Sequence, residues 1–408
     1  MWRLKLFTFA ITSTLLAKLL FTVKLIYYKT PARFRCSFRP AILILWLTRI
    51  LRVDLWIITG EEIASKQKLA IIYTGSEENK NFLIKLAFDS HFRESYIGKT
   101  WLWKIVKTVK ERGYDCSLMV TEVPKVFRIL VERKKCLYVP CWISGEVDIS
   151  ADISPLVKNK SLKSDLRKIR KNKLHFELTN DPPQFHNFYY NMYLPYATKV
   201  HGNRSVIMEY DFMKKEFRNC TLLLIKKEKE YIAGILLAYM ENVVRLWKLG
   251  VKDGNSDYVK DGAIGALFCF SVHYLQQRGY QRVNFGWSRA FLEDGVLKYK
   301  KKWDPRILDT FEIGFLIKPL LKTAGVKGFF LNNPFIYMDK TRLNGAIFME
   351  SDQSISEKDY GRICKDYYLT GINKLVIYRF GEGDGTAREI IPSEYSDRIT
   401  VCSAETLF

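Results

Sequence analysis

The sequence has few of the features that mark a metal-bound or disulfide-stabilised protein. Its eight cysteines are scattered, with no Cys-x-x-Cys pair and no histidine at ligand spacing beside them. They stand at positions 36, 116, 136, 141, 220, 269, 364 and 402. We therefore predict reduced, mostly buried thiols and no metal site, and a metal or disulfide framework is the less favoured alternative. Reduced thiols suit a cytoplasmic compartment.

Acidic residues are absent from the first 53 positions, which carry ten Lys or Arg among many Leu, Ile, Phe and Trp. No apolar run there reaches the roughly 20 residues that a membrane-spanning helix needs. The run 6–17 resembles the core of a signal peptide, but no small-x-small cleavage site follows it. We expect helices that lie on an anionic leaflet, which would place the protein at the inner face of the plasma membrane. Helices packed on the body, or a targeting segment, are the alternatives.

Size and charge bound the function. A chain of 408 residues with 48% hydrophobic content has enough apolar surface for two or three domains, so disorder is excluded. The formal net charge of +22 indicates an anionic partner, either a phosphate-bearing cofactor, nucleic acid or a membrane surface. Composition predicts four segments: a basic apolar helical segment at 1–53, α/β regions at 54–157 and 158–305, and a small α/β region at 306–408.

Region 54–157 alternates between strand and helix patterns. We predict strands at 69–74, 116–120 and 136–142, and helices at 79–91, at 101–112 and from about Pro124. Gly113 ends the second helix. The sequence Glu-Arg-Gly-Tyr-Asp-Cys at 111–116 resembles Gln-Arg-Gly-Tyr-Gln-Arg at 277–282, and both join a helix to a strand. This echo favours two similar halves, although a helix that ends in glycine before a strand is common.

A basic amphipathic helix is predicted at 158–173, where eight basic residues accompany the single acid Asp165. Ser161 is the predicted N-cap, and Leu162, Leu166 and Ile169 share one face. Two interpretations remain open for this helix. It is either a solvated helix whose apolar edge packs on the body, or a surface that contacts the phosphates of a cofactor or an RNA.

The segment 221–304 has the clearest organisation. Apolar runs at 231–240 and 243–251 flank a turn at Asn242 and predict paired strands. A polar loop at 252–261 leads to an apolar helix at 263–278, which ends before Gly279. The strand 281–288 should then lie beside 243–251, which makes a strand, helix, strand unit around a central sheet.

The C-terminal region shows only simple α/β patterns. We predict strands at 346–350 and 375–378, and between them a helix at 356–369 capped by Ser356. No catalytic constellation is visible there.

Two motifs carry a family resemblance. They are Gly-Tyr-x-x-Val-x-Phe-Gly-x-Ser at 279–288 and Gly-x-x-x-Tyr-Lys-x-x-Trp at 295–303. In this order they resemble the GNAT-like acyltransferases of the FemAB-related group, and the segments 161–170 and 192–202 are also similar to that group. The likeness covers about residues 140–305. It implies an α/β fold with mixed sheets, made of tandem GNAT-like (acyl-CoA N-acyltransferase) folds with a degenerate first half.

The resemblance implies an N-acyltransferase that moves an acyl group from acyl-CoA to an amine acceptor, such as an amino sugar or a cell-envelope precursor. An aminoacyl-tRNA-dependent transferase and a non-catalytic GNAT-like protein at a membrane surface are the alternatives. Typical GNAT enzymes hold the coenzyme A pyrophosphate on a glycine-containing loop at a helix start. This chain offers Lys260, Gly262 and Gly265 there, with the glycines at a different interval. Asp304 stands where glycine is typical of the group.

Acyl transfer to an amine needs a deprotonated nucleophile, donors for the developing oxyanion and a proton for the leaving group. Where two strands diverge beside a helix start, backbone amides can meet the acyl carbonyl, which suits Leu249, Gly250 and Val251. The remaining site predictions come from the family motifs: Lys300 as a cation, Tyr299 as a proton donor, His201 as a base or substrate contact, and Phe285, Ser288 and Trp303 as substrate contacts. Their structural alternatives are a solvated lysine, core aromatics, a surface histidine and a serine that closes a turn.

Overall fold

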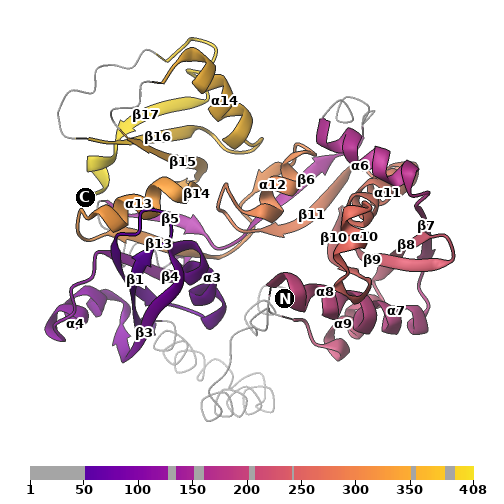
Figure 1. Cartoon of the computed structure of the whole chain (residues 1–408), viewed down its shortest axis with the longest axis horizontal. Coiled ribbons are helices and arrows are strands. Elements are labelled where there is room, and N and C mark those ends of the chain that lie inside the picture. Colours follow the sequence, from indigo (N-terminus) through magenta and orange to yellow (C-terminus); the bar gives the residue numbers. More distant parts are fainter. Residues whose placement is uncertain are drawn as a thin grey trace, which may run out of the picture.

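The computed structural model of the chain describes residues 51–126, 135–150, 160–201, 207–240, 243–350, 355–381 and 391–408. The predicted mixed α/β class is confirmed, because helices pack on two β-sheets that each contain parallel and antiparallel pairs (Figure 1). Figure 1 shows the first and last parts of the chain on one side of the molecule and the middle part on the other.

The first sheet has ten strands in the order β17-β16-β15-β14-β5-β13-β4-β2-β1-β3. Their bounds are β1 Arg52–Glu62, β2 Lys68–Thr74, β3 Phe88–Trp101, β4 Leu118–Pro124, β5 Leu137–Pro140, β13 Ile313–Pro319, β14 Phe335–Asp339, β15 Arg342–Glu350, β16 Leu375–Phe380 and β17 Ile399–Ser403. Because β13 pairs with both β4 and β5, most strands of the predicted C-terminal region complete this sheet.

The second sheet has seven strands in the order β12-β6-β11-β10-β9-β8-β7. They are β6 Ile143–Asp148, β7 His175–Thr179, β8 Cys220–Lys227, β9 Glu230–Tyr239, β10 Val244–Val251, β11 Arg282–Ser288 and β12 Arg306–Leu308. The parallel pair β10 and β11 is joined through helix α11, Ala263–Gln277, whose inner face is buried against the sheet. This is the predicted strand, helix, strand unit.

Helices cover both sheets. Around the first sheet lie α3 Glu77–Ala87, η3 Leu102–Lys104, α4 Ile105–Glu111, α13 Ala324–Asn332, α14 Glu357–Tyr367 and η7 Ala404–Leu407. With the second sheet go α6 Lys160–Lys171, α7 Pro182–Phe188, the π-helix η5 Tyr189–Tyr193, α8 Leu194–His201, α9 Tyr210–Phe217, η6 Lys252–Gly254, α10 Ser256–Lys260 and α12 Gly295–Lys301. The aromatic run at 185–196 supplies a small core of its own with α9 and β8.

Several local predictions are confirmed by backbone geometry. Gly113 and Gly279 follow helices with φ of +74° and +80°, the left-handed region that glycine adopts without strain. The Ser356 side chain caps α14 and exchanges hydrogen bonds with Asp359. On α6, Leu162 and Ile169 are buried.

Other local predictions are wrong. Pro124 does not stand in the first turn of a helix, because it ends β4 and pairs with Ile313; a helical turn begins at the next residue, Lys125. Helix α3 stops at Ala87, since Phe88 begins the unpredicted edge strand β3. Ser161 is not an N-cap, because α6 already begins at Lys160. The predicted strand 136–142 breaks at Cys141 and Trp142, where the chain crosses from the first sheet to the second.

Three predictions fall outside the described residues. They are the basic apolar segment up to position 50, the turn at Asn242 and most of the helix expected after Pro124. Among the helices that are described, none combines the length and the apolar character needed to cross a membrane.

Candidate active site at the junction of the two sheets

Strands β10 and β11 separate early. They pair only at Val244 with Val283 and at Arg245 with Asn284. Beyond these pairs the register of β10 on β9 shifts between Leu246 and Leu249, and β11 has a similar irregularity on β6. Irregular pairing of this kind bends a strand and re-aims its side chains. The two parallel strands therefore diverge at the middle of the second sheet, and the divergence begins four residues before the predicted donor residue Leu249.

Asn284 and Gly286 hold this divergence in place. Gly286 has a φ of +72°, and its amide donates a 2.8 Å hydrogen bond to Asn284 Oδ1 instead of to β10. The Asn284 side-chain amide donates to Ser144 Oγ in β6 at 2.7 Å. A Cβ atom on Gly286 would stand 3.0 Å from the Leu246 carbonyl oxygen. A buried amide and a left-handed glycine thus build the bend into β11.

Lys300 lies at the carboxyl end of β11. Its Nζ donates to the Trp287 carbonyl oxygen at 2.8 Å and to Ser288 Oγ at 3.1 Å. The side chain comes from α12, whose start is capped by the Asp294 carboxylate. Burial lowers the pKa of Lys300 to about 7, and the Asp294 charge offsets part of that decrease. The amine is therefore poised to gain or lose a proton near neutral pH.

Arg289, which directly follows Ser288 at the end of β11, connects the two sheets. Its guanidinium donates to Asn79 Oδ1 at 2.6 Å and lies 3.3 Å from Glu78 Oε1, both on α3 beside the first sheet. The guanidinium also stacks 3.7 Å from the centroid of the Trp142 ring at the crossover between sheets. Arg289 is buried, so its charge is held by these contacts instead of by water.

The start of α3 is itself fixed by a half-buried carboxylate. Glu122 Oε2 on β4 accepts from the Ser76 amide at 2.9 Å and from the Asn79 side-chain amide at 2.8 Å. The side chain of Asn79 therefore links Glu122 to Arg289, because its Nδ2 donates to Glu122 and its Oδ1 accepts from Arg289. A carboxylate at a helix start is also favoured by the helix dipole. These contacts give Glu78 a defined position facing the second sheet.

Glu78 is a carboxylate with two cations, Arg289 and Lys248, near it. Burial raises the pKa of Glu78, and the charges of Arg289 and Lys248 oppose that rise. Lys248 lies in the irregular part of β10, where burial lowers its pKa and the Glu78 charge opposes the change. Its Nζ stands 5.9 Å from the centroid of the Tyr193 ring in η5. The described residues offer Lys248 no hydrogen bond or ion pair, so this amine is available to a ligand.

Arg245 and Trp287 complete the group at the point of divergence. The Arg245 guanidinium carbon lies 5.5 Å from the Trp287 ring centroid, and Nε has no hydrogen-bond partner among the described residues. The Trp287 side chain is 44% exposed although it stands in a central strand. We call Glu78, Arg245, Lys248, Trp287 and Arg289 the junction cluster. It offers cations for phosphate or carboxylate, one carboxylate for an amine, and an indole face for a ring.

The predicted donor residues Leu249, Gly250 and Val251 pair with Ile235, Gly234 and Ala233 of β9. The π-helix η5 crosses this part of β10, and a Cβ atom on Gly250 would collide with the backbone of Met192 and Tyr193. Gly250 is therefore needed for close packing. The backbone amides of β10 that lack a partner on β11 are better sought at Trp247 and Lys248, where the pairing with β9 is also interrupted.

The predicted pyrophosphate loop is covered by another helix. A Cβ atom on Gly262 would stand 2.8 Å from Lys168 Cβ, and one on Gly265 would stand 2.8 Å from Asp165 Cγ. Both contacts belong to α6. Lys260 is exposed and forms a 2.8 Å ion pair with Asp257. The start of α11 thus does not fit a coenzyme A pyrophosphate, because the glycines accommodate side chains of α6.

Three of the predicted site residues lie in the core of the second half. The rings of Phe285 and Trp303 are 5.6 Å apart and both buried, and Phe268 packs on Phe285 and Tyr299. The Tyr299 hydroxyl has no hydrogen-bond partner among the described residues, and burial raises its pKa. Ser288, by contrast, is the contact of Lys300 described above. His201 ends α8, and its side chain lies outside the described part.

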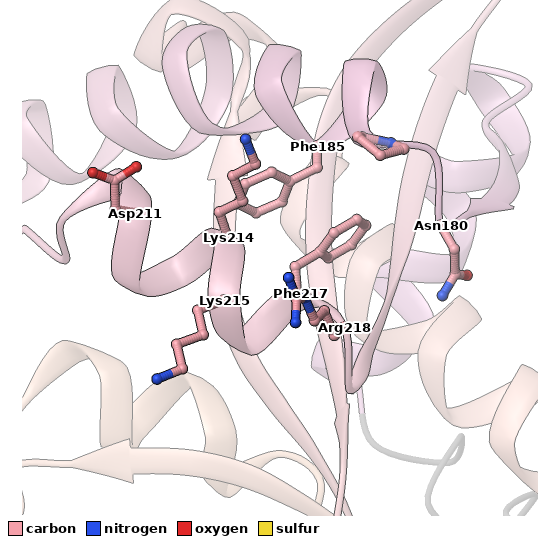
Figure 2. Close-up of a pocket in the computed structure, with 8 residues that line it drawn as sticks. Asn180, Phe185, Asp211, Lys214, Lys215, Phe217 and Arg218 are labelled. Atoms are coloured by element: carbon pink, nitrogen blue, oxygen red, sulfur yellow. The ribbon is translucent and has the colours of Figure 1, made fainter.

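A surface hollow of about 600 Å³ lies apart from these residues, between the start of α7 and the end of α9. Figure 2 shows the Phe185 and Phe217 rings at its centre, while Lys215 points away from them. Those rings stack at 4.5 Å between centroids. None of the predicted site residues lines this hollow. Because its charged side chains are exposed and do not converge, we do not place the reaction there.

The chain shows no metal-binding geometry within its described ranges, where no three His, Cys, Asp or Glu side chains are grouped as ligands. Seven of the cysteines are free thiols, and Cys36 lies outside the described residues. Burial raises the pKa of Cys116 to about 11 and that of Cys220 to about 12. Thiols of this kind are unreactive near neutral pH.

Sequence reasoning missed Glu78, Arg245, Lys248 and Arg289. One signal was available for Arg289, which directly follows an apolar strand in Gly-Trp-Ser-Arg at 286–289. A charged residue at that place has to find partners on another element. Glu78 gave no such signal, because two adjacent glutamates at a helix start are also ordinary surface residues.

Comparisons with known proteins give structural likeness only. No family model and no curated protein sequence matches the chain. FemX aligns with 12% identity over 64% of this chain and 83% of FemX, with a TM-score of 0.35. L-PGS from Bacillus licheniformis aligns with 13% identity over 64% and 80%, with a TM-score of 0.33. A GCN5-related N-acetyltransferase from Kribbella flavida aligns with 7% identity over 83% and 82%, with a TM-score of 0.28.

Proposed function

We propose that the chain is a transferase that moves an acyl group from an activated ester to an amine acceptor at the junction cluster. The observation that carries this proposal is the divergence of β10 from β11 after Arg245 and Asn284. Glu78 of the other half lies 3.3 Å from Arg289, which follows β11, and its charge acts on Lys248 of β10. A strand that leaves its neighbour presents backbone amides, and these are suitable donors for a developing oxyanion.

Three members of the junction cluster, Glu78, Arg245 and Lys248, have a direct role in this scheme. Glu78 takes a proton from the acceptor ammonium, and the freed amine attacks the acyl carbonyl. The carbon–nitrogen bond forms, the ester carbon–oxygen bond breaks, and the second amine proton goes to the departing alcohol. Lys248 and Arg245 bind anionic groups of the donor. The raised pKa of Glu78 supports its role, because a base works best when its pKa approaches the working pH.

Among the two donor classes, we propose aminoacyl-tRNA in preference to acyl-CoA. The packing of α6 against Gly262 and Gly265 removes the space that a pyrophosphate would need at the start of α11. The same helix turns a row of exposed basic residues outward, and a row of cations suits a phosphate backbone. These residues are Lys160, Lys163, Arg167, Arg170 and Lys171. The acceptor is an amine, and we propose a cell-envelope precursor or an amino sugar.

Lys300 is a positioning residue in this proposal. Its hydrogen bonds to Trp287 and Ser288 fix the end of β11, where the indole of Trp287 and the side chain of Arg289 leave the strand. Loss of the amine should move those two groups. The pH profile of transfer should then change, because the protonation of Lys300 near pH 7 alters the hydrogen bonds that it donates.

The test is a transfer assay with mixed aminoacyl-tRNA carrying labelled amino acids, or with labelled acetyl-CoA, on a panel of amino sugars and amine-bearing peptides. We expect transfer from aminoacyl-tRNA, a loss of about 100-fold or more with Glu78→Gln, and retention of fold in that variant. Transfer from acetyl-CoA that depends on Lys260 would replace our donor assignment. Transfer from neither donor, with stabilisation by neither, would favour the alternative of a non-catalytic protein at a membrane surface.

A further inference from the structure

The N-terminal segment enters the fold at one particular corner. Strand β1 begins at Arg52, near the end of the acid-free stretch of the first 53 residues. Arg52 pairs with Trp101 and Val53 pairs with Thr100, so the chain enters beside the last residues of β3. Since β3 is the edge strand of the first sheet, this corner lies at the rim of the molecule next to α4 (Figure 1).

The corner exposes a tryptophan above a row of lysines. Trp103 stacks on Trp101 with ring centroids 5.1 Å apart and planes 18° from parallel, yet the Trp103 side chain is 51% exposed. Lys104, Lys107 and Lys110 follow at a spacing of three, and all three are exposed. An exposed indole beside a row of cations is the combination found where a protein meets a membrane interface.

Packing fixes which way this surface faces. The other side of the same segment is buried through Leu102, Ile105 and Val109, so the lysines cannot turn inward. Acidic groups nearby neutralise little of the charge. Glu111 lies 3.6 Å from Lys107, while Lys104 and Lys110 have no ion pair among the described residues.

We infer that this corner, consisting of Trp103, Lys104, Lys107 and Lys110, docks on an anionic lipid bilayer beside the N-terminal segment. Tryptophan prefers the headgroup level of a bilayer, and each lysine near an anionic leaflet adds to the attraction. The segment before Arg52 has the same composition, apolar and basic without acids, and it joins the fold at this place. This inference does not depend on the proposed transfer reaction.

Co-sedimentation of the full chain with lipid vesicles tests the inference. The vesicles are phosphatidylcholine alone, or phosphatidylcholine with phosphatidylglycerol. One variant replaces Lys104, Lys107 and Lys110 with Gln, and its matched control replaces Lys214, Lys215 and Arg218 with Gln, which removes the same charge from the exposed end of α9. We expect the corner variant to bind anionic vesicles about tenfold or more weakly, and the control to bind them like the wild type.

Trp103→Ala tests the contribution of the indole to vesicle binding separately from the contribution of the lysine charges. We expect this variant to keep the unfolding temperature of the wild type and to bind anionic vesicles several-fold more weakly. If it fails to fold, the lysine variant and its control still decide the outcome. Equal vesicle binding by the corner and control variants would overturn the inference. So would a corner variant that loses binding to an RNA fragment while keeping its affinity for vesicles, because the corner would then be a nucleic-acid surface.

Discussion

The guanidinium of Arg289 and the carboxylate of Glu78 stand 3.3 Å apart across the junction of the two sheets. Arg289 follows the last residue of β11 in the second sheet, and Glu78 stands in the first turn of α3 beside the first sheet. Asn79 and the Cys141 carbonyl oxygen also accept hydrogen bonds from the same guanidinium. One buried side chain therefore determines how the end of β11 sits against the other half.

Two arginines flank β11, the exposed Arg282 at its start and the buried Arg289 just after its end. Replacing Arg289 should destabilise the fold much more than replacing Arg282. We expect Arg289→Met to lower the free energy of unfolding by about 3–5 kcal/mol, because Glu78 and Asn79 lose a buried partner. Urea denaturation measures the change. Arg282 at the other end of the strand is the control, since it is exposed and pairs with Glu146 at 3.7 Å. Arg282→Met should cost about 1 kcal/mol or less, and equal costs for the two variants would contradict the account.

Lys300 should make stability depend on pH. Its pKa is about 7 in the fold against an ordinary value of 10.5, so between these values the unfolded chain binds more protons than the folded chain. The free energy of unfolding therefore rises with pH in this window, with at most about 1.4 kcal/mol per pH unit from this group. Lys300→Met should remove that part of the slope. Burial also lowers the pKa of Lys301, to about 8, with the same sign.

Lys301→Met is the control for this experiment. It should remove its own contribution above about pH 8 and leave the Lys300 contribution between pH 7 and pH 8 intact. Denaturation curves at several pH values supply both slopes. Identical slopes for the wild type and Lys300→Met would show that Lys300 is not buried as a neutral amine.

Gly250 should not tolerate even one methyl group. Its Cβ position collides with the backbone of Met192 and Tyr193 in η5, so Gly250→Ala must push the π-helix away from β10. We expect a loss of about 1–3 kcal/mol in unfolding free energy. Gly295→Ala is the matched control, because a Cβ there meets nothing within 4 Å and its φ is not positive. A neutral Gly250→Ala would mean that η5 does not cover this part of the strand.

Asp304 occupies a left-handed position, with a φ of +47°, where glycine is typical of the group that this chain resembles. Its Oδ1 accepts a 3.0 Å hydrogen bond from Thr370 Oγ1. We expect Asp304→Gly to change the unfolding free energy by about 1 kcal/mol or less, because the easier backbone offsets the lost hydrogen bond. Asp304→Val should cost roughly 1–2 kcal/mol, since a β-branched residue resists this conformation. Thermal unfolding of both variants decides, and a harmless Asp304→Val would refute the strain argument.

Features that depend on local pattern were predictable from the sequence. The unit of β10, α11 and β11 follows from apolar periodicity and from Gly279, and the buried edge of α6 follows from Leu162 and Ile169. Pairings between distant segments were not predictable. β13 pairs with β4 across almost 200 positions, and Arg289 meets Glu78 across 211. The candidate site was only partly visible for the same reason. Lys300 belongs to a local sequence motif and could be predicted. Glu78 is far away in the sequence, and only the tertiary fold brings it to the site.

The donor site predicted at Lys260, Gly262 and Gly265 shows the limit of motif transfer. Glycines at a helix start suit a phosphate, but they also let two helices approach closely. The sequence contains both the glycines and the basic helix that covers them. Only the packing of Gly262 against Lys168 distinguishes the two uses.

The central claim is that the donor binds at the junction cluster, and thermal unfolding with ligand tests it most directly. The samples are the wild type, Lys248→Gln and Lys260→Gln, each with mixed aminoacyl-tRNA, uncharged tRNA or acetyl-CoA. We predict that aminoacyl-tRNA stabilises the wild type and Lys260→Gln, by about 2.7 kcal/mol at 100 times its dissociation constant, and that Lys248→Gln loses most of this gain. Stabilisation by acetyl-CoA that survives Lys248→Gln and disappears in Lys260→Gln would contradict the account.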